Sequence, residues 1–472
     1  MVFNSLVFLL FLVVVLAGYL LVGRSWRLAK TFLLVANNVF YGAWSPPFVL
    51  LLWVSILVDW VAGRLIAGAP TQRRRRLGLV ASLVANLGLL GYFKYGQFFL
   101  DNSALLLGSL GISFQPPAVD IVLPVGISFY TFQSMSYTMD IYRGRSRPWH
   151  SFVDFAVYVT FFPQLVAGPI VRAHDFLPQL SARRRASGAE SGRGLLLLVM
   201  GLVQKMVLAD AWLAPVADRV YSQPQQAGSL DAWAGTLAFA GQIFFDFAGY
   251  STCAMGVALL FGFHLPVNFR SPYAACGFSD FWRRWHISLS TFLRDYLYIP
   301  LGGSRQGTVR TGFNLMITML LGGLWHGAAW HFVAWGGLHG FLLAGEHGVR
   351  TWWSRRPRVL PAWGHPLLVL GTGLLTCLAW TLFRAPDLAS AGELFCRLLW
   401  PVAGGLVPAA EMALVGFLTI ALLAGQWWLR HRDLIERLEG LPAPLLILLI
   451  SFLLVALALA PGEDRAFIYF QF

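Results

Sequence analysis

The 472-residue chain contains 57% hydrophobic and only 12% charged residues, and its mean hydropathy is +0.64. Soluble domains carry about 25% charged residues, so this composition excludes an ordinary soluble protein. Apolar runs near the ~20 residues needed to cross a bilayer recur from end to end, which predicts a polytopic helical membrane protein and not a barrel.

The net charge of +13 comes from short basic clusters that lie between the apolar runs. This distribution follows the positive-inside rule, so we interpret it as a topology signal and predict no nucleic-acid partner. The clusters, all expected on the cytoplasmic side, are at 24–30, 73–76, 143–147, 183–185, 305–310, 355–358 and 430–432.

The apolar runs predict about nine clear membrane spans and two or three broken ones. No Lys or Arg precedes the first run, so we expect it to be a retained span with its N-terminus outside, and not a signal peptide. The charge pattern also places the C-terminal residues 467–472 outside. The expected spans outside the irregular segments are at about 5–23, 31–45, 47–66, 77–95, 121–142, 195–220, 232–263, 366–384, 408–429 and 443–461.

Three segments between these spans predict irregular structure. Residues 151–170 contain Pro163, Gly168 and Pro169 and have basic clusters on both sides, so a re-entrant hairpin fits better than a span. Residues 264–312 are basic and aromatic. Residues 313–346 are too long for one span and short for two, which predicts a broken helix pair that dips toward His326.

Two histidines are the main candidates for chemistry. At 100° per residue, 280–298 predicts one amphipathic helix with Ser279 as its N-cap, and His286 lies on the boundary between its faces. His326 lies in an apolar run beside Gly322, Gly323 and Gly327, which would admit a ligand or another helix. A histidine kept neutral by desolvation is suited to accept a proton from a hydroxyl.

Each of these positions also has a purely structural interpretation. His286 could belong to a lipid-interface anchor and bond only a backbone carbonyl, and His326 could be a core histidine bonded between helices. We expect His331, His339 and His347 to be structural, and at helical spacing His339 points almost opposite to His326. The sequence lacks an H-E-x-x-H motif or Cys/His pairing, so no metal site is predicted.

Buried polar residues occur on two further predicted spans. Lys205 and Asp210 mark either a buried polar site or the point where their helix leaves the apolar layer. Asp246 lies deeper, and we expect it either to pair with an arginine such as Arg284 or Arg294, or to orient a reactive group.

Several blocks of the sequence resemble the bacterial membrane-bound O-acyltransferases, in the branch of the alginate O-acetylation membrane protein and the teichoic acid D-alanyl transferase. The long match around 281–303 is the most specific. The other matching blocks are 123–130, 167–170, 244–251 and 322–327.

This resemblance implies an all-α fold in which helices surround a central tunnel, with about 11 transmembrane helices plus re-entrant or interfacial helices. It implies one domain over 1–472 with its motif-bearing core at about 120–346. It also implies that His326 and His286 are the catalytic-site histidines, with His326 as the general base and His286, the second signature histidine, positioning the donor or lining the tunnel. We expect Arg283, Arg284 and Arg294 to hold the donor's phosphates or carboxylates, and we add Asp295, Asp246 and Trp325 to this predicted donor site.

The function implied is transfer of an acetyl group from a cytoplasmic thioester, either acetyl-CoA or an acyl carrier, with no bound cofactor. The acceptor would be a periplasmic partner that esterifies a secreted exopolysaccharide, which the resemblance implies is alginate, at the bacterial inner membrane. Thr252 stands where alginate-type members have Asp, so another polymer such as cellulose remains open. A transporter and a non-catalytic scaffold of an export complex are the rival interpretations. A Ser288 nucleophile also stays open, although no Gly-x-Ser-x-Gly elbow supports it.

Overall fold

The computed structural model describes residues 1–23, 25–117, 121–353, 364–432, 441–460, 465 and 467–468. The described residues are helical with connecting loops, and none of them forms a strand. Arg24, the predicted cluster at 355–358 and residues 469–472 lie outside this described part. The chain forms two compact units, Met1–Leu195 with Ala254–Pro266, and Leu196–Cys253 with Val267–Phe472. The prediction of a single domain stays a prediction.

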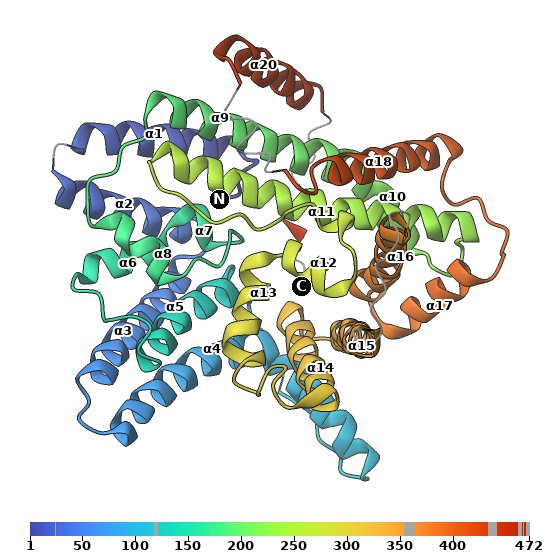
Figure 1. Ribbon diagram of the computed structural model, residues 1–472, viewed down its shortest axis with the longest axis horizontal. Helices are drawn as coiled ribbons and strands as arrows, with labels where there is room; N and C mark the ends of the chain where they lie inside the picture. The colour runs from blue at the N-terminus through green and yellow to red at the C-terminus, as the bar shows by residue number, and fades with distance from the viewer. Residues whose placement is uncertain are drawn as a thin grey trace. The chain divides into compact units, whose positions relative to one another are not determined.

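The first unit begins with four long helices, α1 to α4, and continues through α5 and the short helices α6 to α8 (Figure 1). The helix α3 packs against both α4 and α5, and α2 packs against α1 and α6. The bounds are α1 Leu6–Val22, α2 Trp26–Gly42, α3 Pro46–Gly68, α4 Gln72–Ser109, α5 Ile127–Tyr142, α6 Phe152–Thr160, α7 Phe162–Leu165, α8 Ala173–Phe176 and η1 Leu177–Leu180.

The predicted re-entrant segment is broken and almost entirely buried. The break between α6 and α7 falls at Phe161, where Asn37 of α2 accepts a bond from the Phe162 N–H at 3.1 Å and donates to Thr160 Oγ1 at 3.2 Å. Lys30 Nζ lies 2.5 Å from the buried carboxylate of Asp154. Protein side chains thus satisfy polar groups that lipid could not satisfy.

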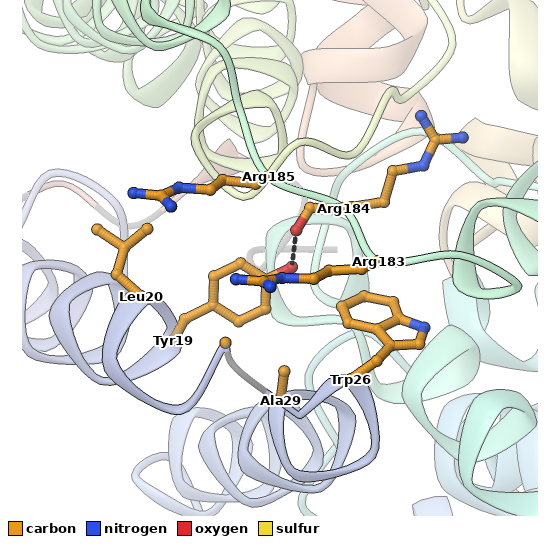
Figure 2. A pocket seen from close by; sticks show the side chains of 8 residues that line it. Tyr19, Leu20, Trp26, Ala29, Arg183, Arg184 and Arg185 are labelled. Carbon is orange, nitrogen blue, oxygen red and sulfur yellow. Dashed lines mark hydrogen bonds between the residues drawn. The ribbon is translucent and has the colours of Figure 1, made fainter.

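The basic cluster 183–185 lies beside the end of α1 and the start of α2, next to Tyr19 and Trp26, as Figure 2 shows. The hydroxyl of Tyr19 donates to the backbone carbonyl of Arg184 at 2.8 Å, and the indole of Trp26 donates to the Leu180 carbonyl at 2.9 Å. Aromatic residues with one apolar and one polar end commonly lie at a membrane interface. This arrangement supports an interfacial position for the cluster.

The second unit carries the predicted reactive residues. Its helices α14 and α15 pack along each other, and α15 also contacts α12 and α16. The bounds of the remaining helices are α9 Gly188–Leu202, η2 Val203–Leu213, α10 Ala214–Ser222, α11 Ser229–Leu260, η3 Pro272–Ala274, α12 Phe278–Arg284, α13 Ile287–Leu293, η4 Arg294–Tyr298, α14 Gly307–His326, α15 Trp330–Trp353, α16 Gly364–Arg384, α17 Leu388–Leu399, α18 Ala409–Trp428 and α20 Ala443–Leu459. The chain passes between the units within α9 and α11.

Six helices within the described ranges are long and apolar enough to cross a membrane: α3, α4, α11, α16, α18 and the continuous 35-residue helix Gly188–Ser222. The apolar α1 and α20 are shorter. All eight coincide with predicted spans. The total of about 11 spans stays a prediction. The helix α17 was not predicted from the sequence.

Candidate active site

His286 interrupts the helix that the sequence predicted over 280–298. Its backbone is left-handed, with φ 43° and ψ 55°, a conformation that residues other than glycine rarely adopt. The segment is therefore three pieces, α12, α13 and the π-helix η4. The predicted N-cap is also wrong, because α12 begins at Phe278 after Gly277, and Ser279 N–H instead donates to Glu346 at 2.9 Å.

Asn268 holds the irregular backbone at His286. The Ile287 N–H donates to the Asn268 backbone carbonyl at 2.9 Å, and the Ser288 N–H donates to Asn268 Oδ1 at 3.1 Å. The same oxygen accepts from Ser288 Oγ at 3.0 Å and lies 3.3 Å from His286 Nδ1. Asn268 therefore fixes both the chain path and the ring of His286, and it also orients the Ser288 hydroxyl.

The His286 ring is fully buried rather than aimed at an open polar cavity. Its edge meets Phe247 of α11, with ring centres 4.6 Å apart. Burial lowers the pKa of His286 to about 3, because desolvation disfavours the charged imidazolium. The imidazole is consequently neutral near pH 7.

His326 is the last residue of α14 and is 3% exposed. Its ring packs edge-on against Trp335 and Phe383, at centre distances of 5.1 and 5.3 Å. Trp325 lies between the two candidate histidines, 5.0 Å from the His326 ring and 6.1 Å from the His286 ring. The structure thus brings both histidines and Trp325 into one buried aromatic cluster.

The broken helix pair at 313–346 is confirmed, with α14 ending at His326 and α15 starting at Trp330. Because of this break, His339 does not point away from the site. Its ring lies 4.8 Å from Trp335, which also contacts His326. The expectation based on continuous helical spacing is therefore wrong for His339.

The glycines beside His326 admit a helix. A Cβ at Gly323 would overlap the Phe332 carbonyl and crowd Gly336, and one at Gly327 would overlap the Phe332 ring. We predict that Gly323→Ala forces α14 and α15 apart and costs about 1–3 kcal/mol, which lowers the thermal unfolding midpoint in detergent. Gly337→Ala is the control, because its Cβ would meet only Leu320, at 3.4 Å. Equal midpoints for the two variants would contradict this packing.

Asp246 pairs with a lysine and not with the expected arginines. Lys205 Nζ lies 2.6 Å from Asp246 and 2.9 Å from Asp210, and all three residues are buried. The pairing of Lys205 with Asp210 follows from the π-helix η2, whose i to i+5 geometry brings residues five apart together. Ile468 N–H donates to the second oxygen of Asp246 at 2.7 Å. Lys205, Asp210 and Asp246 thus form a buried ionic cluster, which favours the first of the two interpretations.

The predicted donor-binding arginines are not equivalent. Arg284 bonds Asp280 at 3.0 Å and the Arg430 carbonyl at 3.2 Å, so it joins segments of the fold. Arg283 and Arg294 are exposed. Arg294 pairs with Asp295 at 2.8 Å, while Arg283 bonds the Ser279 carbonyl. Of the three predicted arginines, Arg283 and Arg294 are therefore the two with exposed side chains.

Two other histidines make contacts inside the second unit, and their expected structural role stays a prediction. His331 Nδ1 lies 3.1 Å from the Leu382 carbonyl, and His339 is enclosed by Phe281, Trp282 and Trp335. Within the described part of the chain, no three His, Cys, Asp or Glu side chains come together in a group that could hold a metal ion.

Comparison with known proteins places this cluster in a family. Residues 146–383 match the model of the membrane-bound O-acyltransferase family. A Pseudomonas aeruginosa protein named "Probable alginate O-acetylase" is 43% identical over 84% of this chain and 74% of its own length. A Helicobacter pylori peptidoglycan O-acetyltransferase is 36% identical over 82% of this chain and 78% of its own length. The chain belongs to the membrane-bound O-acyltransferase family.

Membership makes the protein a membrane O-acyltransferase, and the predicted resemblance is confirmed. A Bacillus subtilis teichoic acid D-alanyltransferase is also similar, at 25% identity over 57% of this chain and 70% of its own length. The family region, 146–383, includes His286, His326, Trp325 and Asp246. The roles of these residues stay predictions.

Three residues that contact the candidate histidines were not predicted from the sequence. Asn268 lies in a loop whose sequence gives no sign that it anchors a residue 18 positions later, and Trp335 and Phe383 resemble ordinary core aromatics. The i, i+5 spacing of Lys205 and Asp210 was a usable signal, but it predicts a pair only if the helix is of the π type.

Proposed function

We propose that this acyltransferase moves an acetyl group from a cytoplasmic thioester to a hydroxyl acceptor for O-acetylation of a secreted exopolysaccharide, alginate or a close relative. The observation that carries the proposal is the cluster of His286, Trp325 and His326, buried together within the family region. The names of the similar proteins support acetyl transfer to a bacterial surface polymer.

In the proposed reaction, His326 takes the proton from the accepting hydroxyl as the oxygen attacks the thioester carbonyl. The C–O ester bond forms, the C–S bond breaks, and the proton passes from the imidazolium to the leaving thiolate. The C-terminal end of the α14 dipole favours the cation formed on His326 by about 0.3–1 kcal/mol. Trp335 and Phe383 exclude water, which would otherwise hydrolyse the thioester.

His286 is proposed as a positioning residue. Its ring is held by Asn268 on one side and by Phe247 on another, and it reaches Trp325, the neighbour of His326. Arg283 and Arg294 are proposed to bind anionic groups of the donor, which is acetyl-CoA or an acyl carrier. A bacterial inner-membrane location, periplasmic termini and a periplasmic acceptor protein belong to the same proposal.

To test this proposal, the gene for this protein is deleted from its native strain and then restored on a plasmid. Two quantities are measured in the secreted material: the total amount of polymer and the ester-linked acetyl per sugar. The proposal expects normal polymer without acetyl, restored by the plasmid. Retained acetyl in the deletion strain would refute it. Loss of the polymer itself would favour the transporter or scaffold, and loss of acetyl from another polymer, such as cellulose or peptidoglycan, would correct the substrate.

A further inference from the structure

A large apolar groove lies in the second unit, apart from the histidine cluster. Three helices, α11, α16 and α18, line its walls, and its volume is about 440 Å³, within the roughly 300–1,000 Å³ of typical ligand sites. Characteristic lining residues are Trp233 and Leu237 of α11, Leu370 and Gly373 of α16, and Leu422 and Trp427 of α18.

The chemistry of the groove walls indicates which kind of molecule fits the groove. Each of the three helices is long and apolar enough to span the membrane, so the groove lies within the depth of the bilayer. A water molecule in this apolar space would find too few hydrogen-bond partners. An extended peptide would bring backbone N–H and C=O groups for which the apolar walls offer no hydrogen bonds. A hydrocarbon chain is apolar and needs no hydrogen bonds, so it fits this groove.

Positive charge gathers where α18 ends. The guanidinium of Arg430 lies 5.5 Å from the ring of Trp427, which lines the groove, and that of Arg432 lies 4.8 Å from Trp428. Arg284 also bonds the Arg430 carbonyl and the Arg270 carbonyl. Asp280 is the carboxylate paired with Arg284, at 3.0 Å, and with Arg430, at 3.7 Å. Among the residues that the structure describes here, Arg284, Arg430 and Arg432 carry more positive charge than Asp280 offsets.

We propose that this groove is a binding site for an anionic phospholipid, with one acyl chain between α11, α16 and α18 and the phosphate at Arg430 and Arg432. Basic residues at the membrane surface attract anionic headgroups, and arginine's planar fork suits phosphate. This site takes a bilayer lipid as a resident ligand, and the inference does not depend on the proposed acetyl transfer.

The bound chain would support the wall of the histidine cluster. Tyr273 lines the groove and donates through its hydroxyl to the Ala240 carbonyl at 2.6 Å. Its ring centre is 6.2 Å from that of Trp285, the residue before His286, and Trp285 in turn lies 4.9 Å from Trp380. Lipid in the groove therefore completes the packing behind the aromatic residues next to His286.

Glycine substitutions on α16 provide a matched test. Gly373 lines the groove and Gly371 does not, although a Cβ at either position meets open space. Gly373→Phe should fill the groove and reduce co-purified phospholipid several-fold, as measured by mass spectrometry of protein purified in mild detergent. Gly371→Phe should retain the wild-type amount. Equal lipid in all three proteins would overturn the proposal.

A second measurement needs no variant. Wild-type protein in nanodiscs is labelled with phosphatidylglycerol that carries a photoreactive diazirine in its acyl chain, and the labelled peptides are sequenced. We expect labels within 366–377 and 419–427, and weaker labelling from a phosphatidylcholine probe. Labelling spread evenly over lipid-facing helices would overturn the site. Equal labelling by both probes would overturn the anionic selectivity, and displacement by a long-chain acyl-CoA but not by phosphatidylglycerol would assign the groove to the donor.

Discussion

Replacing His326 with alanine should reduce ester-linked acetyl on the secreted polymer to background, with polymer secretion unchanged. The expected rate loss is about 10²–10⁴-fold, because the variant lacks the proposed proton acceptor. The buried ring also packs against Trp335 and Phe383, so the alanine variant leaves a cavity. The measurement is acetyl per sugar in strains whose membranes contain equal amounts of each protein.

Two further variants separate chemistry from packing at this position. His326→Gln fills much of the space but accepts no proton at neutral pH, so it should be as inactive as the alanine variant while its thermal midpoint stays nearer the wild type. His347→Ala, on the less buried part of α15, should keep full activity. If His326→Gln retained normal acetylation, His326 would be a structural residue and the proposed base would be wrong.

The apolar spans could be predicted from the sequence because each depends on the length and hydropathy of one continuous segment. Helices α3, α11, α16 and α18 begin and end within a few residues of the predicted limits. Length and hydropathy along a continuous segment decide such helices. The amphipathic α17 was missed because its apolar residues occupy one face of a short helix outside the long apolar runs.

The geometry of the candidate site could not be predicted from the sequence. The periodicity of 280–298 predicts one helix, yet the bonds that Asn268 accepts from the Ile287 and Ser288 N–H groups hold a left-handed turn at His286. Those bonds join segments about 20 residues apart, and local helical preference yields to them. The break at 327–329 likewise depends on packing between Gly323 and Gly336, and it is this break that places Trp335 between His326 and His339.

The partner of Asp246 was mispredicted for a related reason. A buried carboxylate needs a cation or several donors, and Arg284 was a reasonable choice from sequence. In the structure Arg284 is engaged by Asp280, while the π-helix turns Lys205 toward Asp246. The sequence therefore predicted that Asp246 needs a cationic partner. It did not predict which residue, because the apolar pattern of 203–213 does not distinguish a π-helix from an α-helix.

Replacing Lys205 with methionine should destabilise the protein severely. Methionine keeps most of the side-chain length but removes the ammonium that lies between the buried carboxylates of Asp210 and Asp246. Breaking a buried ion pair by removing one partner costs about 3–5 kcal/mol, because the remaining charge stays desolvated and uncompensated. We expect a much lower thermal midpoint in detergent and reduced amounts of folded protein in the membrane.

Arg219→Met is the matched control for this substitution. Arg219 bonds Glu411 at 2.7 and 3.3 Å, but about a third of each side chain is exposed, so the loss should be no more than about 1 kcal/mol. Adding Asp210→Asn and Asp246→Asn to Lys205→Met should recover much of the stability, because the neutral amides no longer leave buried charge. If Lys205→Met and Arg219→Met had the same midpoint, or if the triple variant were no better than Lys205→Met, the ionic cluster would not be the source of the effect. Recovery of folding without recovery of acetylation would instead mean that the charges around Asp246, one residue from the Phe247 that packs on His286, also serve the reaction.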